Sequence, residues 1–134
     1  MIKKRLYYAI LTIFTMALGL GVRCLWHYLP NWINIWIGDF LWAVMLYFAC
    51  RTLFLNVNTR KMTMCLIVFC WVIETSQQFH TPWLDAFRNT TFGGLLLGHG
   101  FLWSDIISYT AGVLVGYWLD SSLQVLTWSE RKEQ

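Results

Sequence analysis

The sequence predicts an all-α integral membrane protein built as a four-helix bundle. Hydrophobic residues make up 57% of the 134 residues and charged residues only 13%, about half of the quarter that is usual in soluble domains. The apolar residues are gathered in four long runs, each close to the ~20 residues that a helix needs to cross a bilayer. The segments between these runs are too short to fold alone, so residues 1–134 form a single transmembrane domain.

The first predicted span, residues 6–28, directly follows the basic residues Lys3, Lys4 and Arg5. A basic start before an apolar run is also typical of a signal peptide. This run is long for a signal peptide, however, and no clear small-residue cleavage site follows it. We therefore interpret it as a spanning helix.

The second and third spans are separated by a polar turn. Pro30 ends the first span, and residues 31–36 are predicted to form a short, Trp-rich piece at the membrane interface. The second span then covers residues 36–55 and the third residues 62–79, with a polar turn between them.

A short helix and a glycine-rich segment precede the last span. Thr81 is a candidate N-cap and Pro82 suits the first position of a helix, which predicts a short interfacial helix over 83–89. Residues 90–103 are apolar, contain four glycines and are too short to cross the bilayer twice. We expect them to lie at the interface or to form a re-entrant segment.

The fourth span is predicted over residues 105–126, with Ser104 as its N-cap. Small and polar residues recur on it at spacings of four, three and four, which places them on one narrow face. They are Asp105, Tyr109, Gly112 and Gly116. Because glycines four apart let helices approach closely, this face is expected to pack inside the monomer.

The basic residues predict the orientation. Successive spans cross the membrane in alternating directions, so most Lys and Arg residues fall on the same side as the N-terminus. Only Arg23 and Arg88 fall on the other side. Positive charge is retained on the cytoplasmic side. Both termini are therefore predicted to be cytoplasmic.

Ionisable and amide side chains gather at the predicted outer ends of the spans, and Glu74 is the least expected of them. Asp39 and Asp105 are predicted near helix N-termini, where the helix dipole favours an anion, but Glu74 is near a C-terminus, where the dipole opposes it. It then needs Arg23 or Arg88 beside it, or a proton. The candidate ligand-binding residues are Arg23, Asp39, Glu74, Gln77, Gln78, Asp85, Arg88 and Asp105.

Two interpretations of these residues remain open. They could form an ion-pair cluster that locks the helices together, because charges within membranes usually pair. They could instead border a cavity roofed by residues 90–103, in which two guanidinium groups would bind a phosphate or carboxylate headgroup. No ligand spacing predicts a metal site or a cofactor, and no basic stripe predicts nucleic-acid binding.

Several motifs resemble known families of small bacterial membrane proteins. Glu74-x-x-Gln77, Arg88, Asp105, Gly112 and Gly116 are similar to the VanZ-like pattern. A closer resemblance, over nearly the whole chain, is to family 2809 of the domains of unknown function, through Gly38-Asp39-x-Leu41-Trp42-Ala43, Glu74-x-Ser76-Gln77, Leu84-Asp85-x-x-Arg88 and Gly98-x-Gly100-Phe101-x-Trp103-Ser104-Asp105. The resemblance implies a multi-pass protein of the bacterial cell (inner) membrane with no established activity.

The functional hypothesis is binding of an anionic lipid or lipid-linked intermediate at an outer-leaflet polar pocket, with membrane lipid as the partner. One alternative is an enzyme acting on such a lipid, with Glu74 or Asp105 as general base. A second is a small proton-coupled transporter in which Glu74 titrates, and a third is a structural or assembly protein. The sequence leaves the oligomeric state open.

Overall fold

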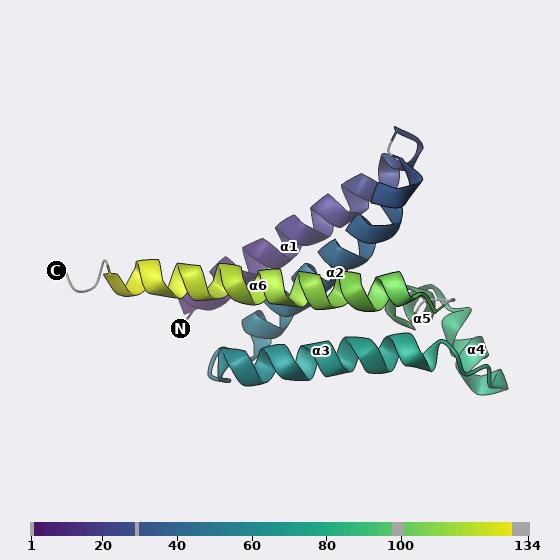
Figure 1. Ribbon diagram of the computed structural model, residues 1–134. Coiled ribbons are helices and arrows are strands. Elements are labelled where there is room, and N and C mark those ends of the chain that lie inside the picture. The colour runs from purple at the N-terminus through teal and green to yellow at the C-terminus, as the bar shows by residue number, and fades with distance from the viewer. Residues whose placement is uncertain (1, 29, 98–100, 130–134) are drawn as a thin grey trace.

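The computed structural model describes residues 2–28, 30–97 and 101–129, and all its elements are helices. The all-α class is therefore confirmed, and four of the helices are long (Figure 1). In chain order, the elements are α1 (Ile2–Cys24), the 3-10 helix η1 (Trp26–Tyr28), α2 (Asn31–Leu53), α3 (Thr59–Ser76), α4 (Pro82–Arg88), α5 (Thr91–Leu97) and α6 (Trp103–Ser129).

Helix α2 is the centre of the packing. It contacts α1 on one side and α6 on the other, and α3 packs mainly on α6. Figure 1 shows α1 and α2 as an antiparallel pair inclined to α3 and α6, with the two short helices α4 and α5 at one end. The core lies between α2 and its neighbours, and its fully buried members include Ala43, Tyr47, Cys70 and Val113.

Two glycines of α6 allow its close approach to α2. A Cβ atom on Gly112 would lie 2.5 Å from the Phe40 carbonyl oxygen and 2.7 Å from Ala43 Cβ. A Cβ atom on Gly116 would lie 2.8 Å from the ring of Tyr47. The glycine stripe thus packs within the monomer, as the spacing predicted.

The start of α2 differs from the prediction. Asn31 opens a continuous helix that runs to Leu53, so no separate interfacial piece precedes the span. Pro30 is its N-cap, and its φ of −57° is close to the value that the proline ring imposes. A proline at this position does not interrupt the helical turns that follow. Asp39 consequently lies two turns inside α2, where the helix dipole no longer accounts for it.

The connection between α3 and α6 agrees with the sequence in part. Helix α4 begins with Pro82 after Thr81, although the Thr81 side chain makes no capping hydrogen bond. Residues 91–97 form α5, whereas Gly98 and Gly100 lie outside the described residues. Ser104 is not a cap, because α6 already begins at Trp103 and the Ser104 hydroxyl donates to Asp105.

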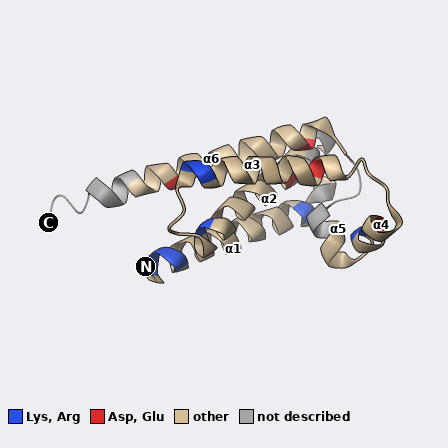
Figure 2. Ribbon diagram, turned by 90° about the horizontal axis from the view of Figure 1, so that it is seen from below, with Lys and Arg blue, Asp and Glu red and all other residues tan. Residues whose placement is uncertain are grey.

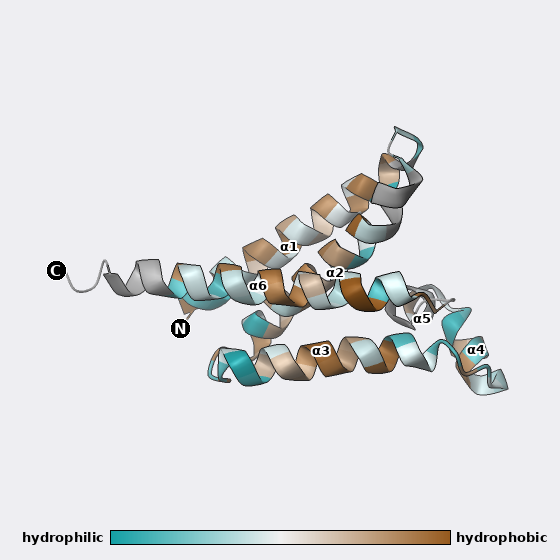
Figure 3. Ribbon diagram, viewed as in Figure 1, coloured by the Kyte–Doolittle hydropathy of each residue, from teal (hydrophilic) through white to brown (hydrophobic). Residues whose placement is uncertain are grey.

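Exposed apolar side chains are frequent on the molecular surface, most of all on α1. Figure 3 shows hydrophobic residues along all four long helices. By length and apolar composition, α1 is the one helix in the described part of the chain that could cross a membrane. The other long helices also carry ionisable residues, among them Asp39 and Arg51 in α2, Glu74 in α3 and Asp120 in α6. Figure 2 shows that these charges lie mostly toward the two ends of the long helices.

Candidate functional site

Three carboxyl groups from three helices meet near the end of the molecule that carries α4 and α5. Asp39 comes from α2, Glu74 from the last turn of α3 and Asp105 from the first turn of α6. We call these residues, with Gln77 and Tyr109, the acidic cluster. The Asp39 carboxyl interacts electrostatically with both other carboxyl groups, so the cluster concentrates negative charge if all three are ionised.

Glu74 is fully buried, and both of its carboxylate oxygens accept hydrogen bonds. Oε1 accepts from the backbone N–H of Leu102 at 3.1 Å, and Oε2 accepts from Gln77 Nε2 at 3.1 Å. Oε1 of the buried Gln77 has no hydrogen-bond partner. A buried amide oxygen without a partner is costly, so this position favours a further donor, such as a protonated carboxyl group.

The other two carboxyl groups of the cluster, those of Asp39 and Asp105, lie close to each other. The Tyr109 hydroxyl donates to Asp39 Oδ1 at 3.3 Å, and the Ser104 hydroxyl donates to Asp105 Oδ1 at 2.9 Å. The two carboxyl groups also interact directly with each other. Two neighbouring carboxyl groups of this kind are stabilised when one of them holds a proton.

The predicted ion pair of Glu74 with Arg23 or Arg88 is wrong. Arg23 is exposed in the last turn of α1, and Arg88 is turned toward other partners. Among the described residues, no Lys or Arg forms an ion pair with a carboxylate of the acidic cluster. The reason is that Arg88 finds its acceptors on backbone carbonyls rather than on Glu74.

Arg88 fastens α4 to the end of α3. It lies in the last turn of α4 and is buried. Its guanidinium donates to the Phe79 carbonyl at 3.0 Å and to the Ser76 carbonyl, where α3 ends. A cation is favoured at such a C-terminus, so Arg88 stabilises the fold, and its removal is expected to loosen α4.

The remaining predicted residues lie at the edge of this arrangement. Asp85 is partly exposed and pairs with Arg88 Nη1 at 3.3 Å and with His80 Nδ1 at 3.4 Å. Gln78 is exposed just beyond α3. In the described part of the chain, no group of three His, Cys, Asp or Glu residues is arranged to hold a metal ion.

The predicted cavity between the arginines and the carboxylates stays a prediction. The structure has a cavity of 380 Å³ on α3 beside Val68, and one of 340 Å³ between α1, α2 and α6. Neither is lined by a residue of the predicted set.

A second polar group, which the sequence analysis missed, lies toward the other end of the long helices. Asp120 of α6 is fully buried, and its Oδ2 lies 2.8 Å from Nε of the buried Arg51 and accepts from the Tyr47 hydroxyl at 3.0 Å. Its Oδ1 accepts from the Tyr8 hydroxyl and from Gln124 Nε2. We call Tyr8, Tyr47, Arg51 and Asp120 the ion-pair cluster.

Arg51 also binds the turn that follows α2. Its Nη1 donates to the carbonyl oxygens of Leu55 and Val57 at 3.4 and 3.3 Å, and its guanidinium lies 5.2 Å from the centre of the Tyr8 ring. The contact of its Nε with Asp120 is an ion pair without the alignment of a hydrogen bond. The ion-pair cluster thus joins α1, α2, α6 and the turn before α3.

A comparison with protein families shows that the chain matches a known family over the residues of the acidic cluster. The family described as "Protein of unknown function (DUF2809)" matches residues 28–113, more than half of the chain. The chain belongs to this family. No solved structure matches the chain, and the more distant resemblance to VanZ-like proteins stays a prediction.

The residues matched by the DUF2809 family include the whole acidic cluster but only part of the ion-pair cluster. The match contains all three carboxylates of the acidic cluster, whereas Tyr8 and Asp120 of the ion-pair cluster lie outside it. The sequence did carry a signal for Asp120: it follows Gly116 by four residues and so continues the polar and glycine stripe of α6.

Proposed function

We propose that this DUF2809 protein is a multi-pass protein of the bacterial inner membrane whose acidic cluster binds and exchanges a proton. Exposed apolar side chains on α1 and on α3 support the membrane assignment. Ile13 of α1 is 62% exposed and Val72 of α3 is 61% exposed. Large apolar surfaces on a small protein mark contact with lipid or with other proteins.

The orientation follows from the basic residues. The starts of α1 and α3 carry Lys4, Arg5, Arg60 and Lys61 at the same end of the molecule as the ion-pair cluster. This end is proposed to be cytoplasmic. The acidic cluster then faces the outer side, near the level at which α3 ends.

The absence of a cationic partner in the described part of the cluster carries the functional proposal. Three carboxyl groups from three helices approach one another, and Glu74 is fully buried. Ionisable residues inside membranes that are not paired are typical of proton relays and transporters. Of the functions open at the start, proton-coupled transport therefore fits best, with the carboxyl groups as the proton acceptors.

Binding of an anionic lipid at this end is less well supported. It requires two guanidinium groups beside the site, but Arg88 is buried against backbone carbonyls and the nearby groups are acidic. Negative charge in the cluster would repel a phosphate. Arg23, which is exposed, is the residue through which such binding would have to act.

A charge-displacement measurement tests the proposal without knowledge of a transported substrate. Vesicles containing the protein are adsorbed to a solid-supported membrane, and the pH on one side is changed rapidly. The wild type should give a transient current as protons enter the cluster, and the triple variant Asp39→Asn/Glu74→Gln/Asp105→Asn should give none. Asp85→Asn is the control, because Asp85 is a carboxylate outside the cluster. An undiminished current in the triple variant would exclude the acidic cluster as the proton site.

A further inference from the structure

An apolar groove runs between α1, α2 and α6, beside the ion-pair cluster. Its volume is 340 Å³, and its walls are formed mainly by Leu11, Phe14, Val44, Phe48, Leu119 and Leu123. Thr15 and Ser122 lie along its walls as well, but both hydroxyls are bonded to their own helices. Thr15 donates to the Leu11 carbonyl and Ser122 to the Trp118 carbonyl. Apart from Tyr7 and Trp118, the groove therefore offers no free polar group to an occupant, and it suits a hydrocarbon chain.

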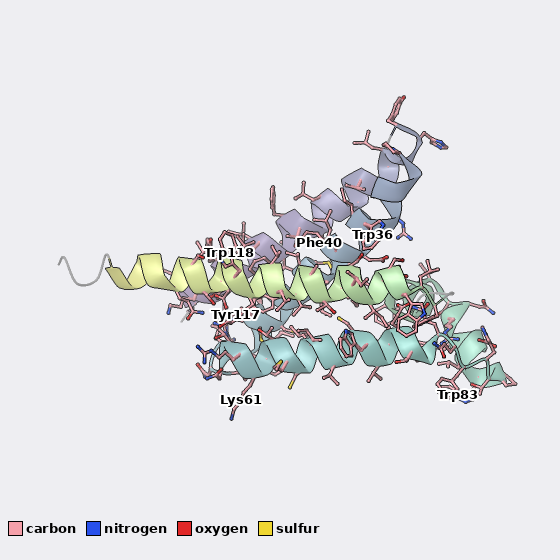
Figure 4. The ribbon with its side chains drawn as sticks, viewed as in Figure 1. Trp36, Phe40, Lys61, Trp83, Tyr117 and Trp118 are labelled. Atoms are coloured by element: carbon pink, nitrogen blue, oxygen red, sulfur yellow. The ribbon has the colours of Figure 1, made fainter. Side chains whose placement is uncertain are left out.

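The end of the groove carries basic residues and aromatic rings. Tyr7 lines the groove, and Lys3 and Lys4 precede it by four and three residues, so they lie one turn further along the same side of α1. Both lysines and Arg5 are exposed. Across the groove, Trp118 lies on the side of α6 that faces α1 (Figure 4). Tyrosine and tryptophan beside lysine are typical of the level at which lipid headgroups lie.

We propose that this groove binds an anionic phospholipid of the cytoplasmic leaflet. One acyl chain lies between α1, α2 and α6, and the headgroup phosphate is held by Lys3 and Lys4, with Arg5 adding positive charge at the same level. The inference rests on the membrane orientation given above but not on proton exchange, and it concerns the end of the molecule opposite to the acidic cluster.

Charge favours a lipid over a second copy of the chain. Two copies in one membrane have their N-termini at the same level, so a twofold contact through this face would bring two sets of Lys3, Lys4 and Arg5 together. Like charges repel, whereas a phosphate group would neutralise them. Membrane leaflets with anionic lipid attract such basic segments for the same reason.

Native mass spectrometry of the full-length protein tests the site. The protein in detergent is mixed with equal amounts of phosphatidylglycerol and phosphatidylcholine that have identical acyl chains. The wild type should retain phosphatidylglycerol several-fold more than phosphatidylcholine. Lys3→Gln/Lys4→Gln/Arg5→Gln should abolish this preference, because the substitutions remove only exposed charges.

Two pairs of variants locate the binding. Ser122→Trp should lower retention of both lipids by filling the groove, whereas Ala111→Trp, on an exposed side of α6, should not. Arg23→Gln and the triple variant of the acidic cluster should both keep the preference. The proposal is overturned if the wild type has no preference, if the basic triple variant keeps it, if Arg23→Gln removes it, or if lipid-free dimers are detected.

Discussion

The two polar clusters place buried carboxylates in opposite situations. Asp120 has a cation 2.8 Å away, two tyrosine hydroxyls and an amide, so its charge is matched by Arg51. Asp39, Glu74 and Asp105 have hydroxyl, amide and backbone donors but no Lys or Arg partner among the described residues. A buried carboxylate that lacks a cation is stabilised by a proton instead. The first cluster is thus arranged to hold a charge, whereas the second is proposed to hold and release a proton.

The largest expected effect is at the ion-pair cluster. Asp120→Asn keeps the size of the side chain but leaves Arg51 buried without an anion, and breaking a buried pair in this way costs about 3–5 kcal/mol. Unfolding of the detergent-solubilised protein, followed by circular dichroism, measures the loss. Arg51→Met/Asp120→Leu is the control, because it removes both charges and should recover much of the stability. Wild-type stability in Asp120→Asn would show that the pair does not hold the helices together.

The next largest effect is at the glycine that separates the two clusters on α6. Gly112→Ala would place a Cβ atom 2.5 Å from the Phe40 carbonyl oxygen. Overpacking of this kind costs about 1–3 kcal/mol. Gly38→Ala is the matched control, since no atom lies within 4 Å of a Cβ there and alanine favours a helix by up to about 1 kcal/mol. Unfolding in increasing denaturant should therefore give shifts of opposite sign, and equal shifts would contradict the packing of α6 on α2.

Two variants of Glu74 distinguish a protonated carboxyl group from an ionised one. Glu74→Ala leaves the Leu102 N–H and the Gln77 amide without an acceptor, which should cost about 1–3 kcal/mol. Glu74→Gln should change stability by less than about 1 kcal/mol, because an amide resembles a protonated carboxyl group and the Gln77 amide can turn to offer its unpartnered oxygen. Thermal melts of both variants provide the measurement. An equal, large loss in the two would mean that the negative charge itself is required.

The smallest effect is expected at Asp39. Asp39→Asn removes one of the neighbouring carboxyl groups but keeps an acceptor for Tyr109. Unfolding should show no loss or a gain below about 1 kcal/mol, since a source of like-charge repulsion is gone. A loss comparable with that of Asp120→Asn would mean that the clusters do not differ in kind.

The sequence predicted the helices better than the partners of their polar residues. Long apolar runs identified four long helices, and the glycine spacing on α6 correctly predicted close packing, because both depend on local pattern. Arg88 was predicted, with Arg23, as a candidate partner of Glu74, yet it binds the carbonyls at the end of α3. Backbone carbonyls compete for a guanidinium wherever a helix ends, and no residue type in the sequence marks them.

Asp120 and Asp39 show two further limits. Asp120 was not predicted as a site residue, although its spacing from Gly116 places it on the packed face of α6. Asp39 was explained by a helix start that lies two turns earlier in the structure, at Asn31. Both errors concern which neighbours a residue meets, which depends on the packing of helices that are distant in sequence.

Infrared spectroscopy at neutral pH tests the difference between the clusters most directly, because a protonated carboxyl group has a C=O stretching band that a carboxylate lacks. The wild type and Asp85→Asn should both show this band, and Asp39→Asn/Glu74→Gln/Asp105→Asn should lose it. If the wild type shows no protonated carboxyl band, the acidic cluster is fully ionised at neutral pH and does not hold the proposed proton.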